Sequence, residues 1–218
     1  NLFATHSGEL MDYINKPIGQ GKPVPGPLKP HIALPTTAGT GSEATSVIVL
    51  DLLQLKVKTG ISHRFIRPTL AIIDPLNSVS CPPMVTAYAG FDVLCHAIES
   101  YTARPYNVRP AVEHPAERPA YIGSNPISDL WCRQAIAWCA QYLRRAYFQP
   151  LDLEARSFMA LASTFAGIGF GNAGVHIPHA MAYPVAGMVR DYFPLDYNVD
   201  EPLVPHGLSV ILNAPAAF

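Results

Sequence analysis

The pattern of apolar positions changes character once along the chain. Up to about residue 77 the apolar residues form short runs between turn residues, whereas from Pro82 onward they recur with helical spacing. Four short runs rich in Val, Ile and Leu predict strands, at 31–35, 46–51, 57–62 and 69–74. A predicted helix at 7–14 precedes them and leads into the proline-rich loop KPIGQGKPVPGPLKP.

The helical part opens with MVTAYAGFDVLCHAIESY, which predicts one long helix. Ser80 or Cys81 is its expected cap, with the prolines that follow in the first turn. A loop rich in proline and charge covers 104–124. The second long helix follows it, with Ser124 or Asn125 as its N-cap and a proline just inside.

A third helix, DLEARSFMALASTFAGIG, is expected to be capped by Asp152. The glycine-rich stretch 167–174 comes next, and its small residues should let two backbones approach closely. A last helix covers about 178–189, and a polar, aromatic loop covers 190–205. A β-rich part therefore precedes an all-helical part, with the boundary near 75–80.

Composition and charge narrow the class of protein. Of 218 residues, 49% are hydrophobic and 14% charged, which fits a packed core and does not fit disorder. The net charge is -1 with no basic stripe, so we expect neither a nucleic acid nor an acidic membrane surface as partner. No apolar run reaches the roughly 18 residues that a membrane span needs. The chain starts at Asn1 and ends in an apolar run, so we expect it to be a piece of a longer protein.

The four cysteines form no CxxC pair, and a reduced setting suits them better than a disulfide framework. Cys132 and Cys139 are seven residues apart on one predicted helix. We expect them to be small, buried, apolar residues.

Four scattered side chains have the chemistry of a metal site. Asp92 and His96 are spaced i, i+4 on a predicted helix, which places both on one face in apolar surroundings. His179 lies near the start of a second helix and His206 near the start of a third. One carboxylate and three imidazoles suit Fe²⁺ or Zn²⁺. The alternative is a helix ion pair together with histidines that are hydrogen-bonded in the core.

The segment PTTAGTGSEAT (35–45) contains Gly39-x-Gly41-x-x-Ala44, which matches the dinucleotide fingerprint. That fingerprint requires a helix after the loop, and here a predicted strand follows. A loop dense in hydroxyls that donate to phosphate or ribose oxygens is the better interpretation, with a plain turn as the alternative. The hydroxyl side chains are Thr36, Thr37, Thr40, Ser42 and Thr45.

The strings PTTAGTGSE, GFDVLCHAIESY, GNAGVHIPHAMAYP and VPHG occur in this order, and together they resemble the iron-containing (group III) alcohol dehydrogenase family, in particular its hydroxyacid-oxoacid transhydrogenase branch. The resemblance implies a dehydroquinate synthase-like fold. Residues 1–77 would be the incomplete, C-terminal part of an α/β nucleotide-binding domain. Residues 78–218 would be an all-α metal-binding domain, truncated at its C-terminus. The active site would lie in the cleft between them.

By the same resemblance, Asp92, His96, His179 and His206 would hold Fe²⁺ or Zn²⁺. A tightly bound NAD would lie against the hydroxyl loop, with Lys58 near a position that contacts the cofactor. The family's GGGSxxD pyrophosphate loop is not in this sequence, which puts tight NAD binding in doubt. Many bacterial relatives carry a second histidine four residues after the first, where this chain has Tyr183, as the transhydrogenase branch does.

The function that the resemblance implies is hydride transfer from a small hydroxyacid, such as 4-hydroxybutyrate, to 2-oxoglutarate, in mitochondria. Such substrates need a cation for their carboxylate, and the sequence does not choose among Arg104, Arg109, Arg118 and Arg190. An ordinary NAD-dependent alcohol dehydrogenase and a non-catalytic piece stay as alternatives, and homo-oligomerisation stays open. A metallohydrolase is a weaker alternative, because hydrolysis needs no nucleotide loop.

Overall fold

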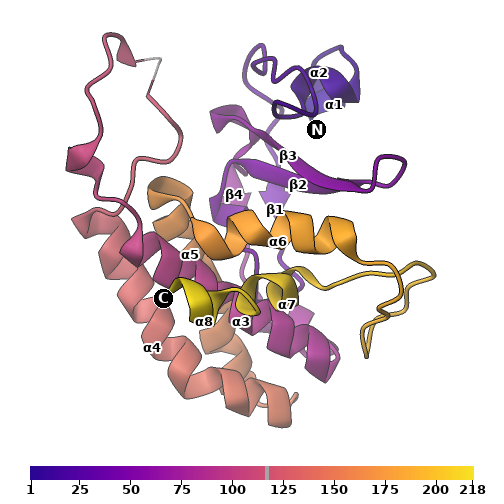
Figure 1. The fold of residues 1–218 in the computed structure, drawn as a ribbon. Helices are drawn as coiled ribbons and strands as arrows, with labels where there is room; N and C mark the ends of the chain where they lie inside the picture. The colour runs from indigo at the N-terminus through magenta and orange to yellow at the C-terminus, as the bar shows by residue number, and fades with distance from the viewer. Residues whose placement is uncertain (116–117) are drawn as a thin grey trace.

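The structure is a computed structural model that describes residues 1–115 and 118–218. Figure 1 shows the strands and two short helices on one side of the molecule and the long helices on the other. The predicted loop at 104–124 lies between two long helices and holds a short 3-10 turn, Tyr106–Val108; its residues 116 and 117 are outside the described part.

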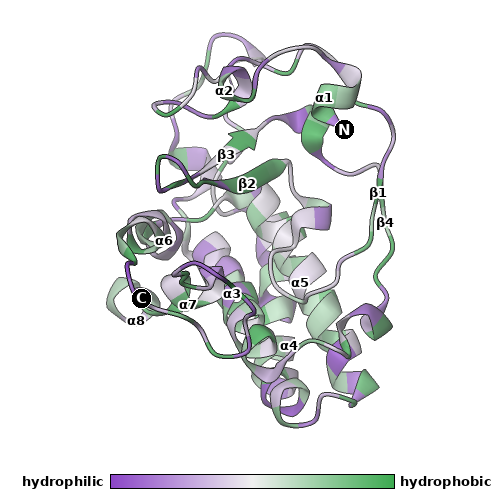
Figure 2. Ribbon diagram, turned by 90° about the vertical axis from the view of Figure 1, so that its right-hand side faces the viewer, coloured by the Kyte–Doolittle hydropathy of each residue, from purple (hydrophilic) through white to green (hydrophobic). Residues whose placement is uncertain are grey.

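The strands form two small sheets. β1 (Ile32–Ala33) pairs in parallel with β4 (Leu70–Ala71), and β2 (Val47–Leu52) pairs antiparallel with β3 (Val57–Ser62). All four predicted strands are confirmed, although β1 and β4 keep only two paired residues each. The apolar side chains around β1 and β4, on one side of the molecule in Figure 2, are about half exposed.

The N-terminal helix prediction is partly wrong. Residues 7–14 hold a single turn, α2 (Leu10–Tyr13), and a further turn, α1 (Leu2–Thr5), precedes them. Such short helices are stabilised by packing rather than by propensity. They cover the hairpin through one apolar cluster, made of Leu2, Tyr13, Ile14, Val24, Leu52, Ile61 and Ile66.

Three long helices form the main core: α3 (Pro83–Thr102), α4 (Pro126–Phe148) and α5 (Leu153–Ala173). Asn125 and Asp152 cap α4 and α5 as predicted, each accepting a backbone N–H three residues on. The predicted caps of α3 are wrong. Its N-cap is Pro82, and the next proline occupies the first position, where no N–H is needed.

Small buried residues let these helices lie close together. Cys132 and Cys139 are buried in the shared core, as predicted. The glycine-rich stretch does not follow α5 but forms its last turns. The predicted close approach is confirmed, since a Cβ on Gly41 would lie 2.7 Å from the Cα of Gly167. The hydroxyl loop therefore rests directly on the backbone of α5.

Three shorter helices complete the fold: α6 (Ile177–Met188), α7 (His206–Ile211) and α8 (Ala214–Ala217). Figure 1 shows α6 running between the β2–β3 hairpin and α7. Both α6 and α7 contact α3, which brings their first turns to its middle. In the described part of the chain, no single helix passes the length and apolarity test for a membrane span; only α5 and α6 taken together do, and they meet at a bend of 101°.

Candidate metal centre

Side chains from three helices meet at the middle of α3. Asp92 and His96 lie one turn apart on α3, His179 lies in the first turn of α6, and His206 is the first residue of α7. The i, i+4 spacing gives the α3 pair a common face, and α6 and α7 pack against that face. The structure thus brings the four predicted ligands to one place.

The carboxylate of Asp92 is at the centre of this group. Its Oδ1 lies 3.3 Å from His179 Nε2, 3.7 Å from His206 Nε2 and 3.7 Å from His96 Nδ1. One ligand atom from each of Asp92, His179 and His206 falls within 4.8 Å of the other two, close enough to share one ion. His96 is outside that set of three. Its ring stacks between Phe170 and His179, with centroid distances of 4.0 and 4.3 Å.

A metal fits these side chains. Asp92 Oδ1, His96 Nδ1, His179 Nε2 and His206 Nδ1 are buried and make no hydrogen bond. Each such group costs about 1–3 kcal/mol when it is left unsatisfied. A first-row dication that binds carboxylate and imidazole would satisfy the atoms that face it. The donor set does not separate Fe²⁺ from Zn²⁺.

The charge states of Asp92, His96 and His206 favour the binding of a cation. Burial opposes charge on Asp92, but the neighbouring imidazoles, His96 first, outweigh it and hold the pKa of the carboxyl well below its ordinary value. Burial lowers the pKa of His96 to about 3 and also lowers the pKa of His206. Both rings are therefore neutral near pH 7, as ligation requires.

His179 behaves differently. Burial alone would lower its pKa, but the neighbouring carboxylates of Asp92 and Glu99 raise it to about 9. A bound dication would expel the extra proton, because it repels positive charge and takes the lone pair of Nε2.

Glu99 is the residue of this centre that the sequence analysis missed. It is fully buried; its Oε1 accepts the backbone N–H groups of His176 and His179, and its Oε2 meets His179 Nδ1. The sequence did carry a signal, since Glu99 is seven residues after Asp92 and so lies on the same face of α3. Because Asp92 and Glu99 lie two turns apart on the same buried face, the Glu99 carboxylate must also be buried, and a buried carboxylate needs a partner.

The hydroxyl loop lies beside α5 and over the first half of α3. It ends in a 3-10 turn, Ser42–Ala44, and passes into β2 rather than into a helix, as the sequence pattern indicated. Thr36, Thr40 and Ser42 are exposed, Thr37 is half-buried, and Thr45 is buried with its hydroxyl donating to Ser42 O at 3.4 Å.

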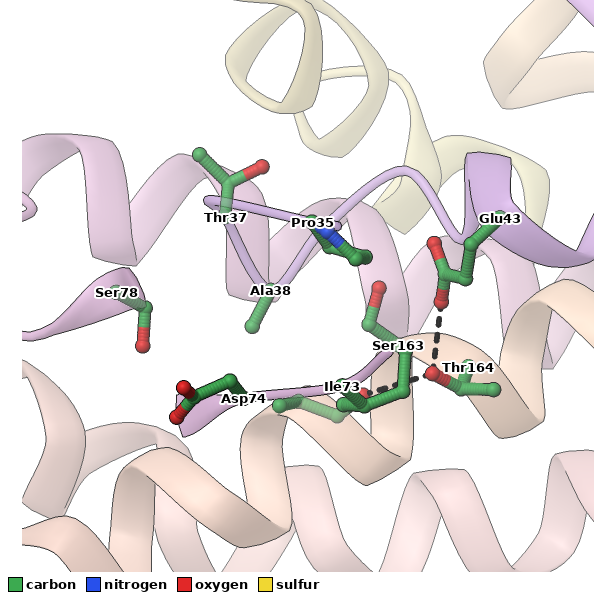
Figure 3. Close-up of a pocket in the computed structure, with 10 residues that line it drawn as sticks. Pro35, Thr37, Ala38, Glu43, Ile73, Asp74, Ser78, Ser163 and Thr164 are labelled. Atoms are coloured by element: carbon green, nitrogen blue, oxygen red, sulfur yellow. Dashed lines mark hydrogen bonds between the residues drawn. The ribbon is translucent and has the colours of Figure 1, made fainter. Parts of the chain in front are cut away.

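Figure 3 shows the cavity beneath the loop, where Glu43 accepts a 2.7 Å hydrogen bond from Thr164 of α5. Its volume of about 10 Å³ holds no more than one water. A nucleotide could therefore meet this loop only on its exposed side.

Lys58 lies on β3 and is mostly buried, with 11% of its side chain exposed, and its Nζ pairs with Asp51 Oδ2 at 2.9 Å. Lys58 and Asp51 are close enough to His206 to influence its charge. Both line an open pocket of about 720 Å³ between the β2–β3 hairpin, the end of α6 and the 190–205 loop. The pocket therefore has one wall next to the candidate ligands.

Among the four arginines proposed for a substrate carboxylate, Arg190 lines this pocket. Its Nη1 donates to two backbone carbonyls, of Gly187 and Val189, at 2.8 Å each. Arg104 instead donates to Val108 O in the loop after α3. Tyr183 lies one turn after His179 on α6 and is half-buried, and burial raises its pKa.

Comparisons with known proteins show which families and structures this chain is similar to. Residues 1–75 match the iron-containing alcohol dehydrogenase family, and residues 86–190 match the C-terminal part of the Fe-containing alcohol dehydrogenase family. The mitochondrial hydroxyacid-oxoacid transhydrogenase of Mus musculus is 61% identical over 221 residues, covering 100% of this chain and 47% of the relative. The chain thus spans about half the length of the curated relatives it matches.

Solved structures extend the similarity to the fold. A crystal structure of 1,3-propanediol oxidoreductase has a TM-score of 0.77 at 33% identity, over 99% of this chain and 47% of that one. The sulfoacetaldehyde reductase from Bifidobacterium kashiwanohense, solved in complex with NAD+, has a TM-score of 0.75 at 32% identity, over 97% of this chain and 47% of that one. The predicted fold class, strands followed by an all-helical part, is therefore confirmed. The division at residues 77 and 78 stays a prediction.

Proposed function

Because this chain belongs to the iron-containing alcohol dehydrogenase family, we propose that its protein is a metal-dependent hydroxyacid-oxoacid transhydrogenase. It takes hydride from a hydroxyacid, such as 4-hydroxybutyrate, onto NAD and passes it to an oxoacid, such as 2-oxoglutarate. The observation that carries the metal part of this proposal is the convergence of ligand atoms from buried Asp92 and His179 and partly buried His206 within 4.8 Å of one another. Identity of 61% to a transhydrogenase over the whole chain supports the choice of reaction within the family.

Asp92, His179 and His206 would hold the metal, with His96 beside them as the fourth candidate. The bound metal supplies Lewis acidity, which lowers the pKa of a substrate hydroxyl and favours its alkoxide. The chain does the rest. The neutral rings of His96 and His206 add no positive charge to the centre. Helices α3, α6 and α7 close around three of the four side chains and keep water from them.

The cofactor part of the proposal rests on the hydroxyl loop. The exposed hydroxyls of Thr36, Thr40 and Ser42 would donate to phosphate or ribose oxygens of NAD, with half-buried Thr37 beside them and Thr45 holding the turn. Lys58 lines the open pocket and is close enough to His206 to affect its pKa, and its ammonium would attract a phosphate or a substrate carboxylate there. The NAD+ bound to a relative that is 32% identical supports a nucleotide in this family.

Three finer points belong to the same proposal. We infer Fe²⁺ as the first choice of metal from the family, with Zn²⁺ accepted by the same donors. The NAD stays bound between the two half-reactions, since a transhydrogenase returns the hydride to a second substrate. The protein works in mitochondria, as the name of its 61% identical relative states for that relative.

The test is turnover of 4-hydroxybutyrate with 2-oxoglutarate by the purified full-length protein, with no NAD added. We expect 2-hydroxyglutarate to form, and we expect metal chelation to abolish its formation. Turnover only with added free NAD would refute the transhydrogenase and favour an ordinary NAD-linked alcohol dehydrogenase. The absence of turnover under both conditions would favour a non-catalytic protein.

A further inference from the structure

We propose that Glu99 is a positioning residue of the metal centre, which fixes His179 in the form that turns Nε2 toward the metal. This inference rests on the proposed function in one respect, since it requires a metal beside Asp92.

Glu99 is an unusual carboxylate for the interior of α3. It is 0% exposed, and among the described residues its ion-pair partners are the two histidines His176 and His179. A buried carboxylate without partners is very costly, so its oxygens must be compensated by what they touch. Here one oxygen contacts backbone and the other contacts a ring.

The backbone contacts come from the start of α6. Glu99 Oε1 accepts the N–H of His176 at 3.0 Å and the N–H of His179 at 3.1 Å. These amides lie at the positive end of the helix, where a negative charge is favoured. Two donors on one oxygen prevent the carboxylate from turning. Its second oxygen, Oε2, is therefore held against His179 Nδ1.

That contact selects the tautomer. An ionised carboxylate only accepts hydrogen bonds, so Nδ1 of His179 must carry a proton. In a neutral ring the lone pair is then on Nε2, which lies 3.3 Å from Asp92 Oδ1 and makes no hydrogen bond. Nε2 is thus the ligating atom. Partners of this kind, beyond the ligands themselves, orient and activate metal-bound histidines.

Glu99 also sets the distance between helices. It joins α3 to the first turn of α6 across 80 positions of sequence. The ring of His179 is therefore held in a fixed position relative to the carboxylate of Asp92 on α3. The ring of His176 is held nearby, with its Nε2 2.8 Å from Thr102 Oγ1 at the end of α3. The first turn of α6 is therefore attached to α3 before any metal binds.

The decisive variant is Glu99→Gln. The amide oxygen keeps the two backbone bonds, but the NH₂ group replaces the acceptor that faced Nδ1. Nδ1 must then accept, which moves the ring proton to Nε2 and blocks ligation. We expect Zn²⁺ affinity, measured against a chromophoric chelator, to fall by about 10–100-fold. The matched control is Glu43→Gln, a buried glutamate that accepts from Thr164 and should leave Zn²⁺ affinity unchanged.

A second measurement needs no variant. In the Zn²⁺-loaded wild-type protein, ¹⁵N imidazole NMR should show His179 protonated at Nδ1 and coordinated through Nε2. Coordination through Nδ1, or wild-type Zn²⁺ affinity in Glu99→Gln, would overturn the role of Glu99 and leave the proposed function standing. Failure of the wild-type protein to bind Zn²⁺ or Fe²⁺ would instead remove the metal centre, and this inference with it.

Discussion

Gly207 offers a direct test of how the metal centre is assembled. It follows His206 in α7, and a Cβ at this position would lie 1.8 Å from the carbonyl oxygen of Tyr88 and 3.3 Å from Asp92 Cβ. Both the oxygen and the carbonyl carbon behind it belong to the backbone of α3, so no side chain can swing away. The substitution Gly207→Ala must therefore push α7 from α3.

The size of that movement follows from the contact. Ordinary van der Waals contact begins near 3.4 Å, whereas the new Cβ would lie 1.8 Å from the oxygen of Tyr88. It would therefore be about 1.6 Å too close, and α7 would have to move by about that distance. A metal site tolerates deviations of about 0.2 Å in its ligand distances. His206 would move away from the metal. Loss of a residue that only orients a ligand typically lowers metal affinity by about 10–100-fold, so we expect the displacement of a ligand itself to lower Zn²⁺ affinity by more than that. Overpacking should also lower the free energy of unfolding by about 1–3 kcal/mol.

Two assays separate these effects. Competition with a chelator gives the Zn²⁺ affinity, and thermal melting of the metal-free protein gives stability, at about 2–4 °C for each kcal/mol in a chain of this length. The control is Gly26→Ala, where the nearest atom to the new Cβ is 3.7 Å away, and its metal affinity should be unchanged. Wild-type affinity and melting temperature in Gly207→Ala would refute the packing of α7 against α3 and the role of His206 as a ligand.

Three further changes test the centre and its supports. His179→Ala should remove bound metal with the fold largely kept, measured by elemental analysis and circular dichroism; unchanged metal content would contradict the assignment. Asn125→Ala should lower the free energy of unfolding by about 0.5–2 kcal/mol through loss of the α4 cap, whereas Asn125→Ser, which keeps an acceptor oxygen but, like Ala, has no NH₂ group, should lose less; equal losses would contradict capping. Burial raises the pKa of Cys95 and Cys139 to about 12 and that of Cys132 to about 11. At about pH 8, a thiol reagent should therefore label only the partly exposed Cys81 in the native protein, and should label the other three cysteines only after denaturation. Fast labelling of a second native thiol would contradict that burial.

Local patterns were enough to predict most of the elements. Alternation and Val/Ile content located all four strands, and the caps Asn125 and Asp152 are confirmed because a cap depends on its own helix alone. The i, i+4 spacing also placed Asp92 and His96 on one face. The one-turn helices α1 and α2 and the continuation of α5 through its glycines depend on tertiary packing, which overrides propensity.

The role of Glu99 could not be predicted from the sequence. It depends on contacts with the backbone amides of His176 and His179, which are 77 and 80 positions away. Periodicity puts Glu99 on the correct face of α3 but does not say which helix end will meet it. In the same way, the spacing of His96 predicts its face, while the stacking of its ring on Phe170 depends on where α5 runs.

The contact between Gly41 and Gly167 bears on how such proteins change during evolution. Neither glycine has room for a side chain, because each meets the backbone of the other. The glycines of the loop are thus constrained by the fold, and Thr40 Oγ1 supports the turn by accepting the N–H of Ser42, whereas the exposed hydroxyls of Thr36 and Ser42 are less constrained. A descendant that lost its cofactor would keep the glycines and could lose those two hydroxyls. In this loop, loss of catalysis would be visible at the threonine and serine positions. The glycine pattern alone would misidentify an inactive paralogue as an enzyme.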